Sequence, residues 1–400
     1  MSVVVTNESW ISRIGGSIKG LVVGLLLVVI SVPVLFWNEG RAVRTAKGLK
    51  EGAGAVVKLD SDSVSPENDG QFVHVTGTAH TDEVLSDDTF GVSVNGIRLS
   101  RNAETYQWVE KTKKKTKKKL GGGTRTETTY SYQKEWKSDR VISGNFHDRT
   151  GHENPESLKF TSQTQQADKV TLGGFRLPDS LIRQIEKPQP LAIDADNLAT
   201  DIAPEITIRD EDAMTRAYWR SGGQYDGTPK IGDTRVSFSA TPITNVSVMS
   251  KQNADTFEPF HTQFGTQLNM LTVGTVSPEN MIAQAEAENA QMTWILRGVG
   301  SAMMFFGFIF LLRPLVILAD VIPPLGWLVG AGTGAVAFLL AGSISLITIS
   351  IAWLYYRPLL ASALIAVAVA LLVVLFLRAR SARRATNDAL EINPHAVGRS

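Results

Sequence analysis

Long uncharged apolar runs lie at both ends of the chain, and one long, mostly polar segment separates them. The first run is Gly20–Trp37, GLVVGLLLVVISVPVLFW. A helix needs about 20 apolar residues to cross a hydrocarbon core of roughly 30 Å. Arg13 and Lys19 would also suit the basic start of a secretory signal peptide, but the run is long for one and Trp37–Gly40 is no small-residue cleavage site. We therefore expect an uncleaved membrane anchor at residues 20–37.

The C-terminal part of the chain predicts further spanning helices. Uncharged residues fill most of residues 295–319, where Arg313 can extend its side chain to the interface. Residues 321–356 hold no charge, which is too long for one span, so Pro323-Pro324 predicts an irregular turn before a third helix. Arg357-Pro358 ends that helix, because proline disfavours helix at the preceding residue. The expected second, third and fourth spans are residues 295–319, 327–355 and 359–377.

Four spans place both chain ends on one side of the membrane. Four arginines follow the last span, which predicts a cytoplasmic tail at residues 378–400 and a cytoplasmic N-terminus at residues 1–19. Basic residues after the first span argue the other way, but they open a very long loop, where the rule has little force. Residues 38–294 are then extracytoplasmic, either periplasmic or lumenal.

Residues 38–294 combine strand and helix patterns. Apolar and polar residues alternate as in half-buried strands, and two more such stretches flank a Lys-rich, Gly-rich segment as in a long hairpin. The predicted strands are Gln71–Thr78, Thr89–Leu99, Thr234–Ser239, and the hairpin pair Tyr106–Glu110 and Thr126–Trp136. Pro178–Lys187 has a helical pattern, and Ser277-Pro278-Glu279 predicts a helix start that continues into the second span. The expected fold is an α+β membrane protein, with four transmembrane helices and a large β-rich extracytoplasmic domain inserted between the first and second.

Composition excludes several classes of protein. The chain has 40 Lys+Arg against 39 Asp+Glu, a net charge of +1, which argues against nucleic-acid binding driven by overall charge. Its 43% hydrophobic content argues against a disordered chain. The absence of cysteine excludes disulfides, thiolate nucleophiles and Cys-ligated zinc.

One basic cluster departs from the acidic middle segment. Residues 111–119 hold seven lysines in nine positions and precede three glycines. Lysines of this kind can contact anionic lipid headgroups or an acidic partner, and the alternative is a solvated, mobile hairpin tip. The candidate residues for an anionic-surface contact are Lys113, Lys114, Lys115, Lys117, Lys118 and Lys119.

Glycines recur at four-residue spacing in two of the predicted spans. Such spacing lets helix backbones approach closely in lipid, although glycine is also simply common in membrane helices. The candidates for helix packing are Gly16, Gly20, Gly24, Gly330 and Gly334, and a homo-oligomer is one expected consequence. No acidic residue lies inside a predicted span, and Arg313 is the only basic one apart from Arg297, which brackets the start of the second span, so an ion-transport pathway is not expected.

The sequence offers no positive sign of catalysis. His147 and His152 lie near acidic residues, but their spacing fits no standard metal signature, so ordinary hydrogen bonding is the simpler interpretation. Asp194-Ala-Asp196-Asn197 begins like a Ca²⁺ loop and lacks the glycine and the distal glutamate. No phosphate-binding loop, dinucleotide fingerprint or nucleophile elbow is present. We therefore predict no catalytic, cofactor-binding or metal-binding residue.

Several segments together resemble the transmembrane protein 43 family, also called LUMA. They occur in family order and cover nearly the whole chain. The segments are Asn38–Ala42, Ser65–Gly70, Leu85–Asp87, Tyr106–Glu110, Tyr130–Tyr132, Glu135–Trp136, Gly151–Pro155, Gly232–Phe238 and Trp353–Pro358.

This resemblance implies four spans with one large loop between the first and second. It also implies residence in the endoplasmic reticulum and inner nuclear membrane for animal members, self-association, a role in nuclear-envelope organisation, and partners such as emerin and lamins. No catalytic residues carry over from the family. The Lys-rich segment and His147 depart from the animal pattern, so any role they have is specific to this chain.

The leading functional hypothesis is a non-enzymatic membrane scaffold that self-associates and binds other membrane proteins within the lipid bilayer, with no nucleic-acid partner. The alternatives are an enzyme or a small-ligand or lipid-binding protein with its site in the extracytoplasmic domain, and an accessory subunit of a channel or transporter. The expected location is the inner membrane in a bacterium, or the endoplasmic reticulum and inner nuclear membrane in a eukaryote.

Overall fold

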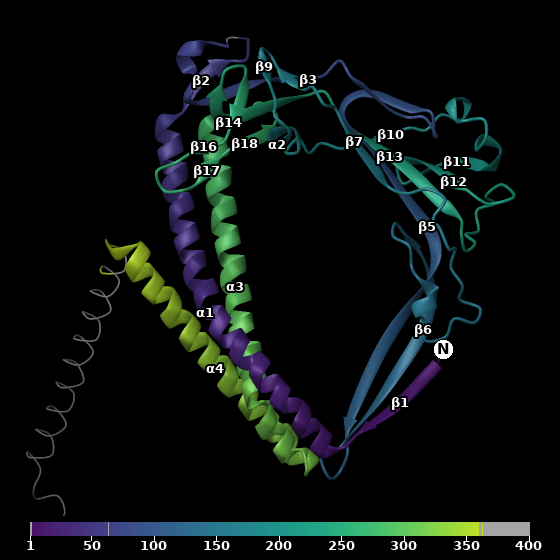
Figure 1. The fold of residues 1–400 in the computed structure, drawn as a ribbon, viewed down its shortest axis with the longest axis vertical. Helices are drawn as coiled ribbons and strands as arrows, with labels where there is room; N and C mark the ends of the chain where they lie inside the picture. Colours follow the sequence, from purple (N-terminus) through teal and green to yellow (C-terminus); the bar gives the residue numbers. More distant parts are fainter. Residues whose placement is uncertain (1, 63, 360–361, 363–400) are drawn as a thin grey trace, which may run out of the picture. The chain divides into compact units, whose positions relative to one another are not determined.

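The computed structural model describes residues 2–62, 64–359 and 362. The chain divides into two compact units. Of the described residues, the β-rich unit comprises 2–15, 44–62, 64–289 and 317–327, and the helical unit comprises 16–43, 290–316, 328–359 and 362. Figure 1 shows both units as a ribbon coloured along the sequence.

Three helices of the described chain are long and apolar enough to cross a membrane. They are α1 (Trp10–Ala55), α3 (Pro278–Ala319) and α4 (Pro323–Tyr356). The first three predicted spans lie inside them, but each helix extends beyond its apolar run. The predicted fourth span at residues 359–377 and the tail at 378–400 lie almost entirely outside the described residues.

Prolines mark the main difference between the predicted and observed helix boundaries. The predicted irregular turn at Pro323-Pro324 is wrong, because α4 begins at Pro323. Proline needs no hydrogen-bond donor in the first turn of a helix, so it fits there. The turn lies instead at residues 320–322. Pro33 and Pro314 lie inside α1 and α3, as is tolerated in membrane helices.

The first sheet of the β-rich unit has nine strands. Its main path runs in the order β1-β6-β5-β13-β12-β11, and β4, β7 and β10 attach to β5 or β13. The strands are β1 Ser2–Glu8, β4 Val84–Asp87, β5 Val92–Lys118, β6 Thr124–Lys137, β7 Gln163–Gln166, β10 Gln189–Leu191, β11 Ile206–Glu211, β12 Met214–Trp219 and β13 Thr234–Pro242.

The second sheet has seven strands in the order β18-β14-β15-β9-β8-β3-β2, and a separate two-stranded ribbon pairs β16 with β17. Its strands are β2 Val57–Asp60, β3 Phe72–His80, β8 Thr171–Leu172, β9 Phe175–Arg176, β14 Thr244–Asn253, β15 Thr256–Glu258 and β18 Met270–Val273, and the ribbon is β16 Phe260–His261 and β17 Gln267–Leu268.

Each sheet covers its own hydrophobic core. Val73, Val75 and Val248 lie fully buried in the core of the second sheet, and Phe90 and Phe238 lie buried in that of the first. Val73 and Val75 occupy alternate positions of β3, as strand geometry requires for side chains on one face, whereas Phe90 enters its core from the turn between β4 and β5.

Most of the predicted strands are confirmed, with two corrections. Strand β5 begins at Val92 rather than Thr89, because a turn ending at Gly91 (φ 59°) precedes it. The helical pattern at Pro178–Lys187 yields only the single turn α2 (Asp179–Ile182).

The Lys-rich segment is not a loop. Residues 111–118 belong to β5 and pair in register with residues 124–131 of β6, so the connection is confined to residues 119–123. Strand β1 adds a third strand along β6, from Ser2 opposite Tyr130 to Glu8 opposite Thr124. Figure 1 shows β1 running beside β6 in this three-stranded ribbon. Sequence analysis did not predict a strand at residues 2–8.

Candidate functional site

A buried carboxylate links three helices within the helical unit. Glu39 of α1 is completely buried. Its two oxygens accept hydrogen bonds from Arg297 of α3, at 2.6 Å from Nε and 2.8 Å from Nη2. Trp353 of α4 donates from Nε1 to the same carboxylate at 2.8 Å. A bidentate guanidinium pair is among the strongest charge-assisted arrangements, so the Glu39 side chain fixes α1, α3 and α4 against one another.

The residues on either side of Glu39 also contact the helical unit. Asn38 Nδ2 donates to the carbonyl of Thr293 at 3.1 Å, and Arg41 Nη2 donates to Thr293 Oγ1 at 3.0 Å. A Cβ at Gly40 would lie 2.5 Å from Cζ of Tyr356. Only glycine therefore lets the α1 backbone approach the Tyr356 ring. The segment Asn38–Arg41, quoted above for its family resemblance, forms the contact surface of α1 in this cluster.

A second buried carboxylate joins three distant segments of the β-rich unit. Asp320 is fully buried and accepts from Arg13 Nη2 at 2.6 Å and from Lys118 Nζ at 2.5 Å. Trp10 Nε1 donates to the carbonyl of Ile317 at 2.8 Å, and the backbone N–H of Gly121 donates to the carbonyl of Val321 at 3.1 Å. We call these contacts the Asp320 junction. It joins the start of α1, the tip of the β5–β6 hairpin and the α3–α4 turn.

The Asp320 junction and the β1–β6 ladder bear on membrane sidedness. The predicted topology places residues 1–19 and residues 38–294 on opposite sides of a bilayer. Residues 2–8 pair continuously with residues 124–130, and a ladder of backbone hydrogen bonds cannot form across a bilayer. The predicted placement and the ladder are therefore incompatible, and the sidedness of the domains stays a prediction.

The structure separates the six candidate lysines into groups. Lys118 pairs with Asp320, and Lys119 Nζ donates to Asn7 Oδ1 at 2.6 Å. Within the described residues, the other four lysines are exposed and form no ion pair: Lys113, Lys114, Lys115 and Lys117. The Lys-rich segment thus contains both lysines held by a partner and exposed lysines without an ion pair.

The two histidines considered for a metal form aromatic stacks. His147 stacks on Tyr130 with ring centroids 4.2 Å apart, and His152 stacks on Tyr132 at 3.8 Å. Tyr132 donates to Glu110 at 2.9 Å, and both desolvation and the Glu110 carboxylate raise the pKa of its hydroxyl. No group of three or more metal-ligating side chains occurs in the part of the chain that the structure describes.

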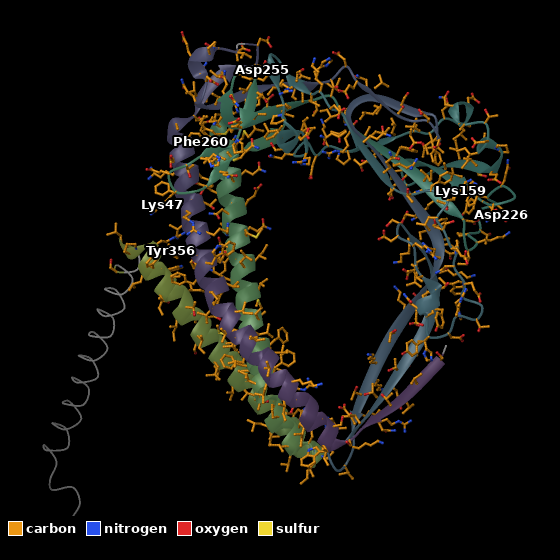
Figure 2. The ribbon with its side chains drawn as sticks, in the orientation of Figure 1. Lys47, Lys159, Asp226, Asp255, Phe260 and Tyr356 are labelled. Carbon is orange, nitrogen blue, oxygen red and sulfur yellow. The ribbon has the colours of Figure 1, made fainter. Side chains whose placement is uncertain are left out.

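A surface cavity of about 540 Å³ lies at the end of β12, and sequence analysis did not predict it. Trp219, Lys159 and Lys230 line it, together with the buried pair Arg220–Asp233. Arg220 donates to Asp233 at 3.0 Å from Nε and 2.7 Å from Nη2, and this pairing raises the pKa of the guanidinium. Figure 2 labels Lys159 in this region and, near it, Asp226, which pairs with Arg220 at 3.1 Å. The Arg220 guanidinium is thus compensated by two carboxylates.

The predicted glycine positions differ in their surroundings. A Cβ at Gly24 would lie 2.7 Å from the carbonyl oxygen of Gly307 on α3, whereas one at Gly330 would lie 3.6 Å from Val316. Gly16, Gly20 and Gly334 have no such neighbour within 4 Å in the described chain. Sequence analysis missed Gly307, whose small size allows the close approach of α3 to Gly24. The role of these glycines in helix packing stays a prediction.

Comparisons with known proteins match most of the chain. The family model described as Transmembrane protein 43 matches residues 105–358. Transmembrane protein 43 of Rattus norvegicus is 36% identical over 90% of this chain and 90% of its own length. The Homo sapiens protein is 35% identical over 94% and 93%, and a Drosophila melanogaster homolog is 27% identical over 86% and 90%. No solved structure matches. The chain belongs to the transmembrane protein 43 family of membrane proteins.

Proposed function

We propose that this protein is a non-enzymatic membrane scaffold that self-associates and organises other membrane proteins. One observation carries the proposal. In α1, α3 and α4, the most apolar stretch of the helix is mostly exposed. Only 17%, 17% and 28% of these stretches, respectively, is buried within the chain. Most of this apolar surface is left for lipid and for helices of other proteins. Glu39, Arg297 and Trp353, which we call the Glu39 cluster, already hold the three helices together.

The glycine distribution supports self-association. In lipid, helices associate through close backbone packing at small residues rather than through a hydrophobic driving force. Helix α3 packs directly against Gly24. In contrast, a Cβ at Gly16 or Gly20 of the same helix would have no neighbour within 4 Å in the described chain. These two positions are free to receive a helix from a second copy or from another membrane protein.

The location follows the family. We propose a multi-pass protein of the endoplasmic reticulum and inner nuclear membrane with a role in nuclear-envelope organisation if the source is a eukaryote, and of the inner membrane if it is a bacterium. Emerin-like or lamin-like partners would apply only in the first case.

A ligand-binding role is the second candidate, and the cavity beside Trp219 favours it. Its volume of about 540 Å³ lies within the usual range of roughly 300–1,000 Å³ for small-molecule sites. Asp233 is its only carboxylate, and Arg220 already binds both oxygens. The cavity therefore suits a neutral polar ligand better than acid–base chemistry. Binding of such a ligand would leave the scaffold role intact.

Affinity purification of the full chain in mild detergent tests the scaffold, with mass spectrometry of co-purifying proteins and light scattering for the oligomeric state. We expect an oligomer or a defined set of membrane partners. Gly20→Ile should reduce association while leaving the monomer folded, because nothing lies within 4 Å of Gly20. Gly24→Ile is the matched control, because it should disturb α1–α3 packing instead. Recovery of a lone, folded monomer would contradict the proposal.

A further inference from the structure

Strand alternation places the exposed lysines of the hairpin on opposite faces. Successive side chains of a strand point to opposite faces, and residues paired directly across strands share a face. Lys113, Lys115 and Lys117 of β5 therefore lie on one face of the three-stranded ribbon, and Lys114 lies on the other. The pairing of β5 with β6 is continuous from Thr105 to Lys118, so no bulge changes this assignment.

Residues of β6 and β1 complete the first face, which we call the cationic face. Cross-strand rows join Lys113 to Thr129 and Val3, and Lys117 to Arg125 and Asn7. Lys119 donates to Asn7, so it also lies on this side. The uncompensated cations of the cationic face are Lys113, Lys115, Lys117 and Lys119.

Neighbouring carboxylates do not neutralise the cationic face. Glu127 lies in the row of Lys115, but its ion pair is with Arg125 at 3.3 Å. On the opposite face, Lys118 is neutralised by the buried Asp320, so among these six lysines Lys114 is the one uncompensated cation there. The six lysines that the sequence grouped together thus divide into four on one face, one on the other, and one used in a buried ion pair.

Two exposed apolar side chains lie on the cationic face. Val3 is 59% exposed and Val5 is 43% exposed, and their rows contain Lys113 and Lys115. The Asp320 junction and the β1–β6 ladder hold the ribbon in this arrangement. A flat surface that combines several lysines with exposed valines has the character of a membrane-surface contact, where charge attracts anionic headgroups and apolar side chains enter the interface.

We propose that the cationic face of the hairpin docks on the surface of a bilayer through anionic lipid headgroups. Charge complementarity selects this occupant. Residues 38–294 contain 30 basic and 35 acidic residues, so the four lysines are a local exception in an acidic segment. The chain is embedded in a bilayer through its apolar helices, so headgroups are present at high local concentration wherever the protein resides.

Site-specific fluorescence tests the proposal, and the absence of cysteine in the chain permits single labels. Thr129→Cys places a label on the cationic face beside Lys113, and Thr116→Cys places one on the opposite face. Each full-length variant carries an environment-sensitive fluorophore in nanodiscs of phosphatidylcholine alone or with phosphatidylglycerol. We expect a blue shift for Thr129→Cys in the anionic nanodiscs, which high salt reverses, and none for Thr116→Cys.

A matched pair of charge reversals gives the decisive comparison. Lys115→Glu and Lys114→Glu change the net charge equally, at adjacent exposed positions of one strand. Each unit of charge near an anionic surface changes binding about fivefold, so Lys115→Glu should lower the docked-to-undocked ratio roughly twenty-fold or more, and Lys114→Glu should change it little. Equal effects of the two variants, or no difference between neutral and anionic nanodiscs, would overturn the proposal. Circular dichroism confirms that each variant keeps its strands.

Discussion

The two units each bury a carboxylate, but they neutralise it in different ways. In the helical unit, Glu39 receives a bidentate arginine and an indole N–H. In the β-rich unit, Asp320 is shared between Arg13 and Lys118, whose side chains are 12% and 37% exposed. A buried ion pair stabilises only when desolvation is matched by good geometry. The Glu39 cluster is therefore a fixed helix contact, whereas the Asp320 junction retains a lysine that can exchange its partner for water.

The sharpest test of the Asp320 junction asks whether the N-terminus and the hairpin tip lie on the same side of the membrane. The answer is all or none. Single cysteines at Asn7 and at Leu120 should react with a membrane-impermeant maleimide from the same side, because β1 and β6 pair along residues 2–8. Labelling in sealed, oriented vesicles measures this. Reaction from opposite sides would support the predicted topology and show that the ladder does not form in the membrane.

Removing the partner of Glu39 should have the largest effect on stability. Arg297→Met leaves a fully buried carboxylate without its cation, which costs about 3–5 kcal/mol. Thermal unfolding in detergent should show a large loss of stability for Arg297→Met. The double variant Glu39→Gln with Arg297→Met removes both charges and should recover part of the loss. Equal stability of the single and double variants would mean that the charge pair is not what holds the helices.

The packing of Gly40 on Tyr356 predicts an intermediate effect. Gly40→Ala introduces a Cβ into the space of the ring, and overpacking of this kind costs about 1–3 kcal/mol. Gly54→Ala in the same helix is the matched control, because no atom lies within 4 Å of that position. Thermal unfolding should show a loss of stability only for Gly40→Ala. An equal loss of stability in the two variants would contradict a packing contact between Gly40 and Tyr356.

The Asp320 junction should be weaker than the Glu39 cluster. Asp320→Asn removes the charge that Arg13 and Lys118 share, and we expect a cost of about 1–2 kcal/mol, because Lys118 can turn to water. Limited trypsin digestion of the hairpin tip in native protein measures the opening of the junction. Lys118→Gln should also speed cleavage, whereas Lys114→Gln should not. Unchanged protection of the tip in Asp320→Asn would mean that the ladder alone anchors the hairpin.

The smallest expected effect is a pH dependence at the start of α3. Hydrogen bonds from its own backbone N–H, from Ser277 and from Lys58 lower the pKa of Glu279 from 4.5 to about 2. Because the folded-state pKa is depressed, the stabilisation is present above pH 4.5 and is lost as the pH falls toward 2. Unfolding curves of the wild-type chain and Glu279→Gln should differ at neutral pH and converge in acid. If the difference in stability between the two proteins did not change with pH, the Glu279 carboxylate would not stabilise the start of α3 in this way.

The sequence was most informative where a single local pattern decides the structure. Three apolar runs identified α1, α3 and α4, and alternation identified β3, β6 and β13. The Glu39 cluster was partly foreseeable, because Glu39 follows the first apolar run and Arg297 precedes the second, and antiparallel spans bring those ends together. Trp353, near the end of the third run, meets them for the same reason.

Other features depend on contacts between residues far apart in sequence, which no local pattern specifies. Residues 2–8 alternate too weakly to be recognised as a strand, and only β6 gives them partners. Pro178–Lys187 has helical spacing, yet α2 ends at Ile182 within the buried core of the second sheet. The cavity beside Trp219 is assembled from two loops, at residues 155–159 and 220–233, and from the strands β5 and β12.

By itself, the sequence determined that this protein is a membrane protein with long apolar helices, a β-rich segment and a cluster of lysines, because hydrophobic length, alternation and charge are written locally along the chain. Only the tertiary structure decided which carboxylates are buried and which cations neutralise them. It also decided that one of the seven clustered lysines reaches Asp320 while four others share an exposed face. Strand register and long-range packing set these differences, and neither can be read from a run of similar residues.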